Sequence, residues 1–160
     1  MVQMHPLTTK KSILGILERL LNQSRQDKLM YLNAADRMDA PTYKRFLNQQ
    51  ALQRNNFFHQ LSTALSNHGI DQEEVLLNRP DIRQLMMTSP KRDKSNPFIK
   101  CIAQDDHFRM LLMEIMAIDT IDFNLNIYQK ILDKLDYSQA ENERFKEELA
   151  EKTLRTEGLF

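Results

Sequence analysis

Hydrophobic positions near the N-terminus recur at steps of three and four, the spacing that places side chains on one face of an α-helix. The stripe consists of Ile13, Leu17, Leu20, Ser24, Asp27, Tyr31, Ala34 and Met38. Thr8 or Thr9 can cap the N-terminus of this helix. The pattern predicts a long first helix over about residues 10–38.

A second stripe follows after a very short connection. Asp39 can cap the new helix, and Pro41 falls in its first turn, where a missing N–H costs little. The stripe consists of Tyr43, Leu47, Gln50, Arg54, Phe57, Leu61 and Ala64, and Gly69 stands where a C-terminal cap belongs. These features predict a helix over about 40–68. Because the connection is short, the first two helices should be antiparallel neighbours.

The periodicity breaks up between residues 70 and 104, where three prolines and the basic polar segment 89–95 predict a long crossover. Regular spacing returns over about 106–135, after Asp105 or Asp106 as a cap. Its stripe consists of Phe108, Leu111, Ile115, Ile118, Asp122, Leu125, Gln129 and Leu132. Ser138 followed by Glu141 has the spacing of a capping box, which predicts a fourth helix over about 139–156.

This order of elements is two tightly joined helices, one long crossover and two more tightly joined helices. It predicts an all-α fold of the ferritin-like four-helix-bundle class, in which two antiparallel helix pairs are joined by a long crossover. The composition agrees, because 160 residues with 3 Gly and no Trp offer little material for a sheet. A chain of this length is expected to form a single domain over 1–160.

Charge and composition exclude several classes of function. Lys plus Arg and Asp plus Glu both number 22, so the balance of charge does not favour a nucleic-acid partner. Three scattered glycines cannot form a phosphate-binding loop. The first apolar stretch, 13–21, is interrupted by Gly15 and charged residues, which argues against a signal peptide and a membrane span. Together with a single cysteine, Cys101, this predicts a cytoplasmic location.

Polar residues on the stripes are the candidate chemistry. Asp27, Gln50, Arg54 and Asp122 fall near the middle of their predicted helices, where a buried carboxylate must pair, take up a proton or bind a cation. In a structural interpretation, Arg54 pairs with Asp27 and Asp122, and Gln50 completes a polar centre. In a metal-binding interpretation, the candidate ligands for iron or manganese are Asp27, Glu114, Asp119 and Asp122.

The histidines favour the structural interpretation. Di-iron bundles use a Glu-x-x-His pair on each of two helices, and no Glu in this sequence has a His three residues later. No cofactor is therefore expected in the structural interpretation, and catalytic residues are not assigned.

The sequence also resembles a bacterial ferritin-like four-helix-bundle family of unknown function, over about residues 12–135. The matching features are Leu21-Asn22, Tyr31-x-x-Ala34-Ala35, Arg54-x-x-Phe57-x-x-x-Leu61, Gly69, the acidic pair Asp105-Asp106, and Asp122 followed by Tyr128. The resemblance implies a bundle, often dimeric, whose metal chemistry is not established. Gln53 and Asn56 stand where iron-handling relatives would carry Glu-x-x-His on the second helix, and Glu141 with Arg144 on the fourth.

These features together predict a small non-enzymatic bundle with a stress-associated or interaction role, and the alternative is a divergent metal-binding protein. The fourth helix has a thin apolar face carrying Phe145 and Leu149. We expect these two side chains to contact a second copy of the chain or another protein partner.

Overall fold

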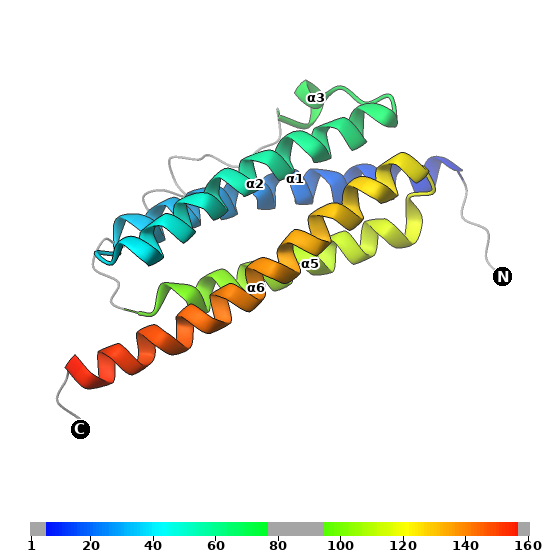
Figure 1. Ribbon diagram of the computed structural model, residues 1–160. Coiled ribbons are helices and arrows are strands. Elements are labelled where there is room, and N and C mark those ends of the chain that lie inside the picture. The colour runs from blue at the N-terminus through cyan, green and yellow to red at the C-terminus, as the bar shows by residue number, and fades with distance from the viewer. Residues whose placement is uncertain (1–5, 77–94, 157–160) are drawn as a thin grey trace.

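The computed structural model describes residues 6–76 and 95–156, and every regular element within those ranges is a helix. The elements are α1 (Pro6–Asp36), α2 (Pro41–Asn67), α3 (Gln72–Leu76), α5 (Pro97–Ile118) and α6 (Asp122–Thr156). Figure 1 shows the four long helices side by side as two pairs, with the C-terminal end of α6 running past the other helices. The predicted all-α bundle is confirmed.

Each long helix packs against two others. α1 lies against α2 and α5, and α6 lies against α5 and α2. Hydrogen bonds from Tyr43 to Glu148 and between Asn67 and Asn124 show that α2 and α6 are antiparallel. α2 and α5 therefore run in the same direction on opposite corners of the bundle. One long connection between two antiparallel pairs produces this arrangement.

The first helix pair lies close to its predicted bounds. α2 begins with Pro41 at its first turn, and Ala40 rather than Asp39 holds the N-cap position without a side-chain hydrogen bond. Gly69 ends the helix at a φ of 74°, and its N–H donates to the carbonyl of Ser66 while that of Ile70 donates to Leu65. This pair of bonds is a Schellman motif, which satisfies carbonyls left open at the end of a helix.

The predicted bounds of the second pair are wrong. The break lies at residues 119–121, not at 136–138, so 106–135 is not one helix and 139–156 is not a separate one. Asp119 caps the end of α5, and its carboxylate accepts from the N–H of Ile121. The hydrophobic spacing stays in phase across this short break, which is why the stripe predicts a continuous helix. Ser138 lies in mid-helix and caps nothing.

The predicted crossover 70–104 is too long at its C-terminal end. The five-residue helix α3 lies near its start, and α5 begins at Pro97 with Asn96 as the N-cap, whose side chain accepts from the N–H of Phe98. The rest of the predicted crossover, residues 77–94, lies outside the described residues.

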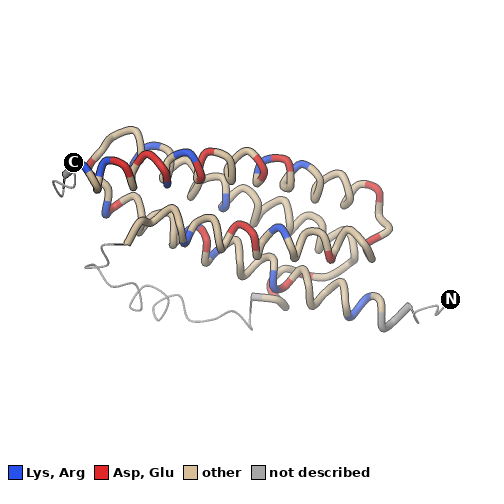
Figure 2. The backbone as a smooth tube through the Cα atoms, turned by 90° about the horizontal axis from the view of Figure 1, so that it is seen from below, with Lys and Arg blue, Asp and Glu red and all other residues tan. Residues whose placement is uncertain are grey.

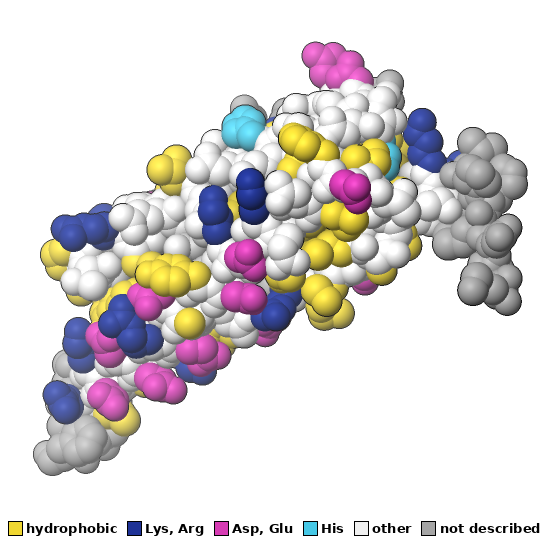
Figure 3. Space-filling view, turned by 45° about the vertical axis from the view of Figure 1, so that its right-hand side comes forward, with side chains coloured by type: hydrophobic (Ala, Val, Ile, Leu, Met, Phe, Trp, Pro, Cys, Tyr) yellow, Lys and Arg dark blue, Asp and Glu magenta, His cyan; other side chains and the backbone are white. Residues whose placement is uncertain are grey.

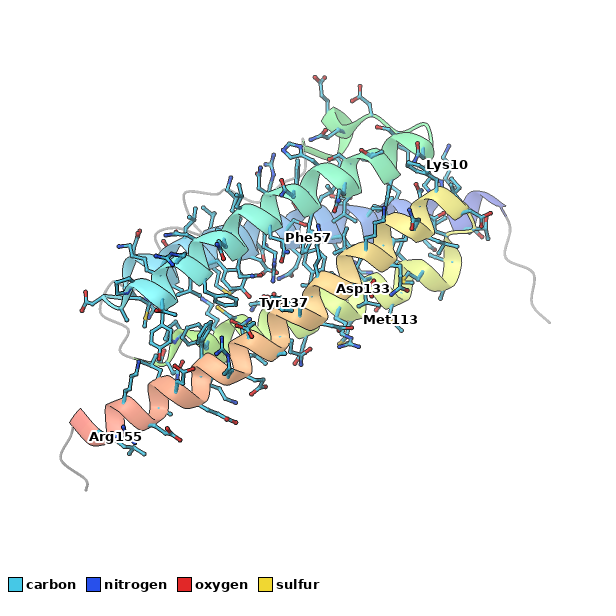
Figure 4. All side chains as sticks on the ribbon, in the orientation of Figure 1. Lys10, Phe57, Met113, Asp133, Tyr137 and Arg155 are labelled. Carbon is cyan, nitrogen blue, oxygen red and sulfur yellow. The ribbon has the colours of Figure 1, made fainter. Side chains whose placement is uncertain are left out.

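Two hydrophobic clusters fill the bundle. The larger one surrounds Phe57 and Phe108. Figure 4 labels Phe57 on α2, and its side chain is buried in the interior between the helix pairs. The smaller one, around Tyr43 and Phe98, occupies the other end. On α2 the smaller cluster ends at Ala51 and the larger one begins at Phe57. The buried residue between them is Arg54. The predicted polar centre lies in this gap.

None of the described helices is long and apolar enough to cross a membrane. Acidic and basic residues interleave along the helices in Figure 2, which agrees with the zero formal net charge of the chain.

Candidate functional site

The centre of the bundle is built around Arg54 on α2. Its side chain is fully buried, with 0% of its surface exposed. Nη2 donates to Oδ1 of Asp105 on α5 at 2.8 Å, and Nη1 donates to Oε1 of Gln50 at 3.0 Å. The guanidinium also lies over the rings of Tyr31 and Phe57. A planar cation that cannot lose its proton in the interior is thus paired with one buried carboxylate and two aromatic faces.

Three neutral side chains extend the hydrogen bonds around this ion pair. Tyr31 on α1 donates to Oδ2 of Asp105 at 2.7 Å, and the amide of Asn142 on α6 donates to the Tyr31 hydroxyl at 2.9 Å. Ser138, one turn earlier on α6, donates to Oε1 of Gln50 at 2.7 Å. All four long helices therefore contribute to one network, and we call these residues the central network.

The charges in the central network support one another. Burial alone would lower the pKa of Arg54, but the adjacent Asp105 outweighs it and raises that pKa. Burial raises the pKa of Tyr31 well above its usual value, so the phenol stays protonated and remains a donor. Burial also raises the pKa of the Cys101 thiol, one turn before Asp105, which keeps the thiol protonated and unreactive.

Asp27 lies next to the network but does not pair with Arg54. Its Oδ1 accepts from Nε2 of Gln23 at 2.7 Å, and its Oδ2 is buried without a hydrogen-bond partner in the described part of the chain. Burial raises the pKa of Asp27 well above its usual value, and the nearby Asp105 raises it further. The bundle centre thus holds one paired carboxylate, Asp105, and one that favours its protonated form, Asp27.

Asp27, Gln50 and Arg54 are all buried near the bundle centre. Asp122 is not: it is exposed at the first turn of α6, because the helix break places it at the end of the bundle. The predicted pairing of Arg54 with Asp27 and Asp122 is therefore wrong, and Asp105 is the partner.

The four predicted metal ligands do not converge. Glu114 pairs with Arg19 at the surface, at 3.7 Å, and Asp119 and Asp122 flank the turn between α5 and α6, far along the bundle from Asp27. Among residues 6–76 and 95–156, no group of three or more His, Cys, Asp and Glu side chains could hold a metal ion. The centre also carries the fixed positive charge of Arg54, so its donor set does not fit the iron site of a ferritin-like bundle.

Asp119 belongs to a second polar cluster at the α5–α6 turn. Its Oδ2 lies 2.9 Å from Nε2 of His68 and accepts from Tyr128 at 2.7 Å and from Asn124 at 3.1 Å. Burial acts to raise the pKa of Asp119, but hydrogen bonds, first that of His68, lower it overall. The cluster ties the end of α2 to the turn.

Sequence reasoning missed Asp105, Ser138 and Asn142. Asp105 looked like a cap because the helix was expected to begin after it. With the helix beginning at Pro97, Cys101, Asp105 and Phe108 follow one another at steps of four and three on a single buried face. That spacing was available as a signal. Ser138 and Asn142 lie in the same way between the buried residues Leu135 and Phe145, at steps of three and four on one face of α6.

The two side chains expected at an interface, Phe145 and Leu149, differ in how deeply they are buried. Phe145 is buried and makes an edge-to-face contact with Phe46, with ring centres 4.9 Å apart. It is therefore part of the interior and is not exposed for a partner. Leu149 is partly buried and packs against the same cluster.

No protein-family model and no curated protein matches this sequence. Among solved structures, the fold matches that of a dodecameric thioferritin, the bacterioferritin-related protein from Bacteroides fragilis. The TM-score is 0.71, and the match covers 90% of this chain and 89% of that chain at 9% sequence identity. The fold is therefore that of a ferritin-like bundle, as predicted.

Proposed function

We propose that this protein is a non-enzymatic ferritin-like bundle that acts by associating with further copies of itself. The observation that carries the first part is the central network. Arg54 and Asp105 neutralise each other where the four helices meet. Tyr31 donates to Asp105, Arg54 donates to Gln50, and Ser138 also donates to Gln50. Such a buried network can hold helices in register, and within the described residues its polar groups bond mainly to one another.

The second part is supported by large apolar side chains on the outside of the bundle. Met110 and Met113 lie on one face of α5 and are 62% and 55% exposed. Figure 4 labels Met113 on the α5–α6 side of the bundle. In Figure 3, hydrophobic side chains gather away from the charged C-terminal end of α6, where acidic and basic groups interleave. Flexible methionines are common at protein-binding surfaces because they adapt to a partner.

The occupant we propose for this face is a second copy of the chain. The solved structure with the same fold belongs to a dodecameric protein, so a ferritin-like bundle of this size can be built into a symmetric assembly. A homo-oligomer needs a surface patch on every subunit, and the exposed methionines of α5 supply one.

Mass measurement in solution tests this proposal. Size-exclusion chromatography with light scattering should give a multiple of 18.9 kDa for the wild type. Met110→Lys with Met113→Lys should shift the mass toward the monomer while circular dichroism stays unchanged. The control, Asn48→Lys with Gln49→Lys, adds the same charges to exposed positions on α2 and should leave the mass unaltered. A wild-type monomer, or an assembly that survives the methionine substitutions, would overturn the proposal.

The stress-associated role, the cytoplasmic location and a different protein partner stay predictions from the sequence. The metal-binding alternative also stays a prediction. Its four candidate ligands do not lie together, so their positions do not favour it. Elemental analysis of protein purified without chelator, followed by calorimetric titration with Fe(II) and Mn(II), decides that alternative directly.

A further inference from the structure

A cleft of about 190 Å³ opens between the C-terminal half of α1 and the first two turns of α5. At roughly 30 Å³ for each water molecule, it has room for about six of them, or for a small organic molecule. Its lining includes Asp27, Met30, Arg37, Pro97, Lys100 and Gln104. We call it the α1–α5 cleft. The central network does not use it, apart from the neighbouring Asp27.

Asp27 supplies an unsatisfied hydrogen-bonding group in the lining of the cleft. None of its surface is exposed, and Oδ2 has no partner in the described ranges. The amide of Gln23 donates to Oδ1 and also to Oε1 of Gln104, at 2.7 and 2.9 Å, which fixes Oδ1 as an acceptor. Burial raises the pKa of Asp27, so the carboxyl tends to hold a proton, and Oδ2 is the oxygen left to carry it. A buried O–H without an acceptor can donate a hydrogen bond to a ligand that enters the cleft.

The charged groups around the cleft are basic. Lys100 stands exposed on the first turn of α5, and Arg37 is half-buried just beyond the end of α1 on the other side. Met30 and Pro97 add apolar wall between them. The backbone N–H of Phe98 is already taken by the Asn96 side chain, so side chains rather than the helix end would recognise an anion here. The lining therefore combines the Asp27 carboxyl, two cations, the side-chain amides of Gln26, Asn33 and Gln104, and a short apolar surface.

We infer that the α1–α5 cleft binds a small organic carboxylate with a short apolar chain. One carboxylate oxygen accepts from Asp27 Oδ2–H, the ammonium of Lys100 pairs with the negative charge, and the chain packs on Met30 and Pro97. Arg37 adds positive charge from the α1 side of the cleft. A cationic ligand is disfavoured because both basic residues would repel it. This inference is independent of self-association.

An NMR titration of the full-length chain tests the inference. The probes are sodium butyrate, n-butylamine hydrochloride and sodium phosphate at matched ionic strength and pH 7. Butyrate should produce saturable shifts confined to amides of residues 26–37 and 97–104. Lys100→Gln removes an exposed charge without touching the core and should weaken butyrate binding roughly tenfold. Lys134→Gln, at an exposed position on α6, is the matched control and should not change the affinity.

Variants at Asp27 separate donor from charge. Asp27→Asn keeps a donor at the position of Oδ2 and should retain butyrate binding, whereas Asp27→Leu should abolish it in a chain whose spectrum shows the native fold. Absence of saturable butyrate shifts, or an equal loss in Lys100→Gln and Lys134→Gln, would overturn the inference. Preference for butylamine would show an ionised Asp27 and a cation site, and binding of phosphate alone would show an inorganic anion site. Either result also rejects the proposed ligand.

Discussion

Removing the carboxylate of Asp105 should destabilise the bundle more than almost any other single truncation. In the wild type, this side chain is 2% exposed and accepts from Arg54 at 2.8 Å and from Tyr31 at 2.7 Å. Asp105→Ala leaves the Arg54 guanidinium fully buried with only neutral partners such as Gln50. Breaking a buried ion pair from one side costs about 3–5 kcal/mol. Whole domains are stable by about 5–15 kcal/mol, so a large fraction of the stability should disappear.

Urea denaturation followed by circular dichroism measures this cost. We expect the midpoint to fall sharply for Asp105→Ala. Asp106→Ala removes an exposed carboxylate from the next position on the same helix and should change the free energy of unfolding by about 0.5 kcal/mol or less. The comparison isolates the ion pair from any general effect of losing an acid from α5.

A double replacement distinguishes an unpaired charge from lost packing. Arg54→Met combined with Asp105→Leu removes both charges and keeps apolar volume, so it should cost clearly less than Asp105→Ala alone. If Asp105→Ala costs under about 1 kcal/mol, or if the double replacement costs as much as the sum of the single ones, then Arg54 is not held by Asp105 in the way described.

Three further predictions concern other sites. The folded-state pKa of Asp119 lies below its unfolded value, so its stabilisation is present above about pH 4 and is lost as the pH falls through the folded pKa. Asp119→Asn should flatten this acid limb in unfolding experiments across pH, and an unchanged limb would contradict the prediction. The pKa of Asp27 is raised instead, so its favourable contribution is complete below about pH 4 and is lost as the pH rises through the folded pKa. Asp27→Asn should therefore raise the free energy of unfolding at pH 7, and a clear loss of stability there would show that the carboxylate is paired. Gly69 has a φ of 74°, so Gly69→Ala should destabilise by about 1–2 kcal/mol. Gly15 lies within α1 with open space where a Cβ would stand, so Gly15→Ala should stabilise by about 0.5–1 kcal/mol, and denaturation curves that move in the same direction for both would refute the argument.

The first helix pair shows how far local pattern can go. The stripes on α1 and α2 are long and strongly periodic, Pro41 marks the start of α2, and Gly69 marks its end. A helix in which hydrophobic residues recur every three or four positions can bury them only by facing a core. The existence, length and inward face of these helices therefore follow from the sequence. The interior position of Asp27, Gln50 and Arg54 follows with them.

The second pair shows where local pattern stops. The break at 119–121 is held by Asp119, whose side chain contacts His68 on α2 and Ile121 on its own chain segment. The contact between Asp119 and His68 joins residues far apart in the sequence, so helical periodicity cannot predict it. Ser138 carried the local signature of a helix start, but its hydroxyl is used by Gln50 on α2. Tertiary hydrogen bonds therefore determine that the helix break lies at Asp119 and not at Ser138.

The sequence by itself determined that this chain is an all-α bundle with charged and amide groups near the middle of its interior. Only the tertiary structure decided that Asp105 pairs with Arg54 and that Asp27 is left to the α1–α5 cleft. The reason is that helical periodicity specifies which face of a helix is buried but not the height at which two helices meet. That height depends on where each helix begins and ends. The start of α5 at Pro97 places Asp105 inside the helix on its buried face, and the break at 119–121 leaves Asp122 exposed at the first turn of α6.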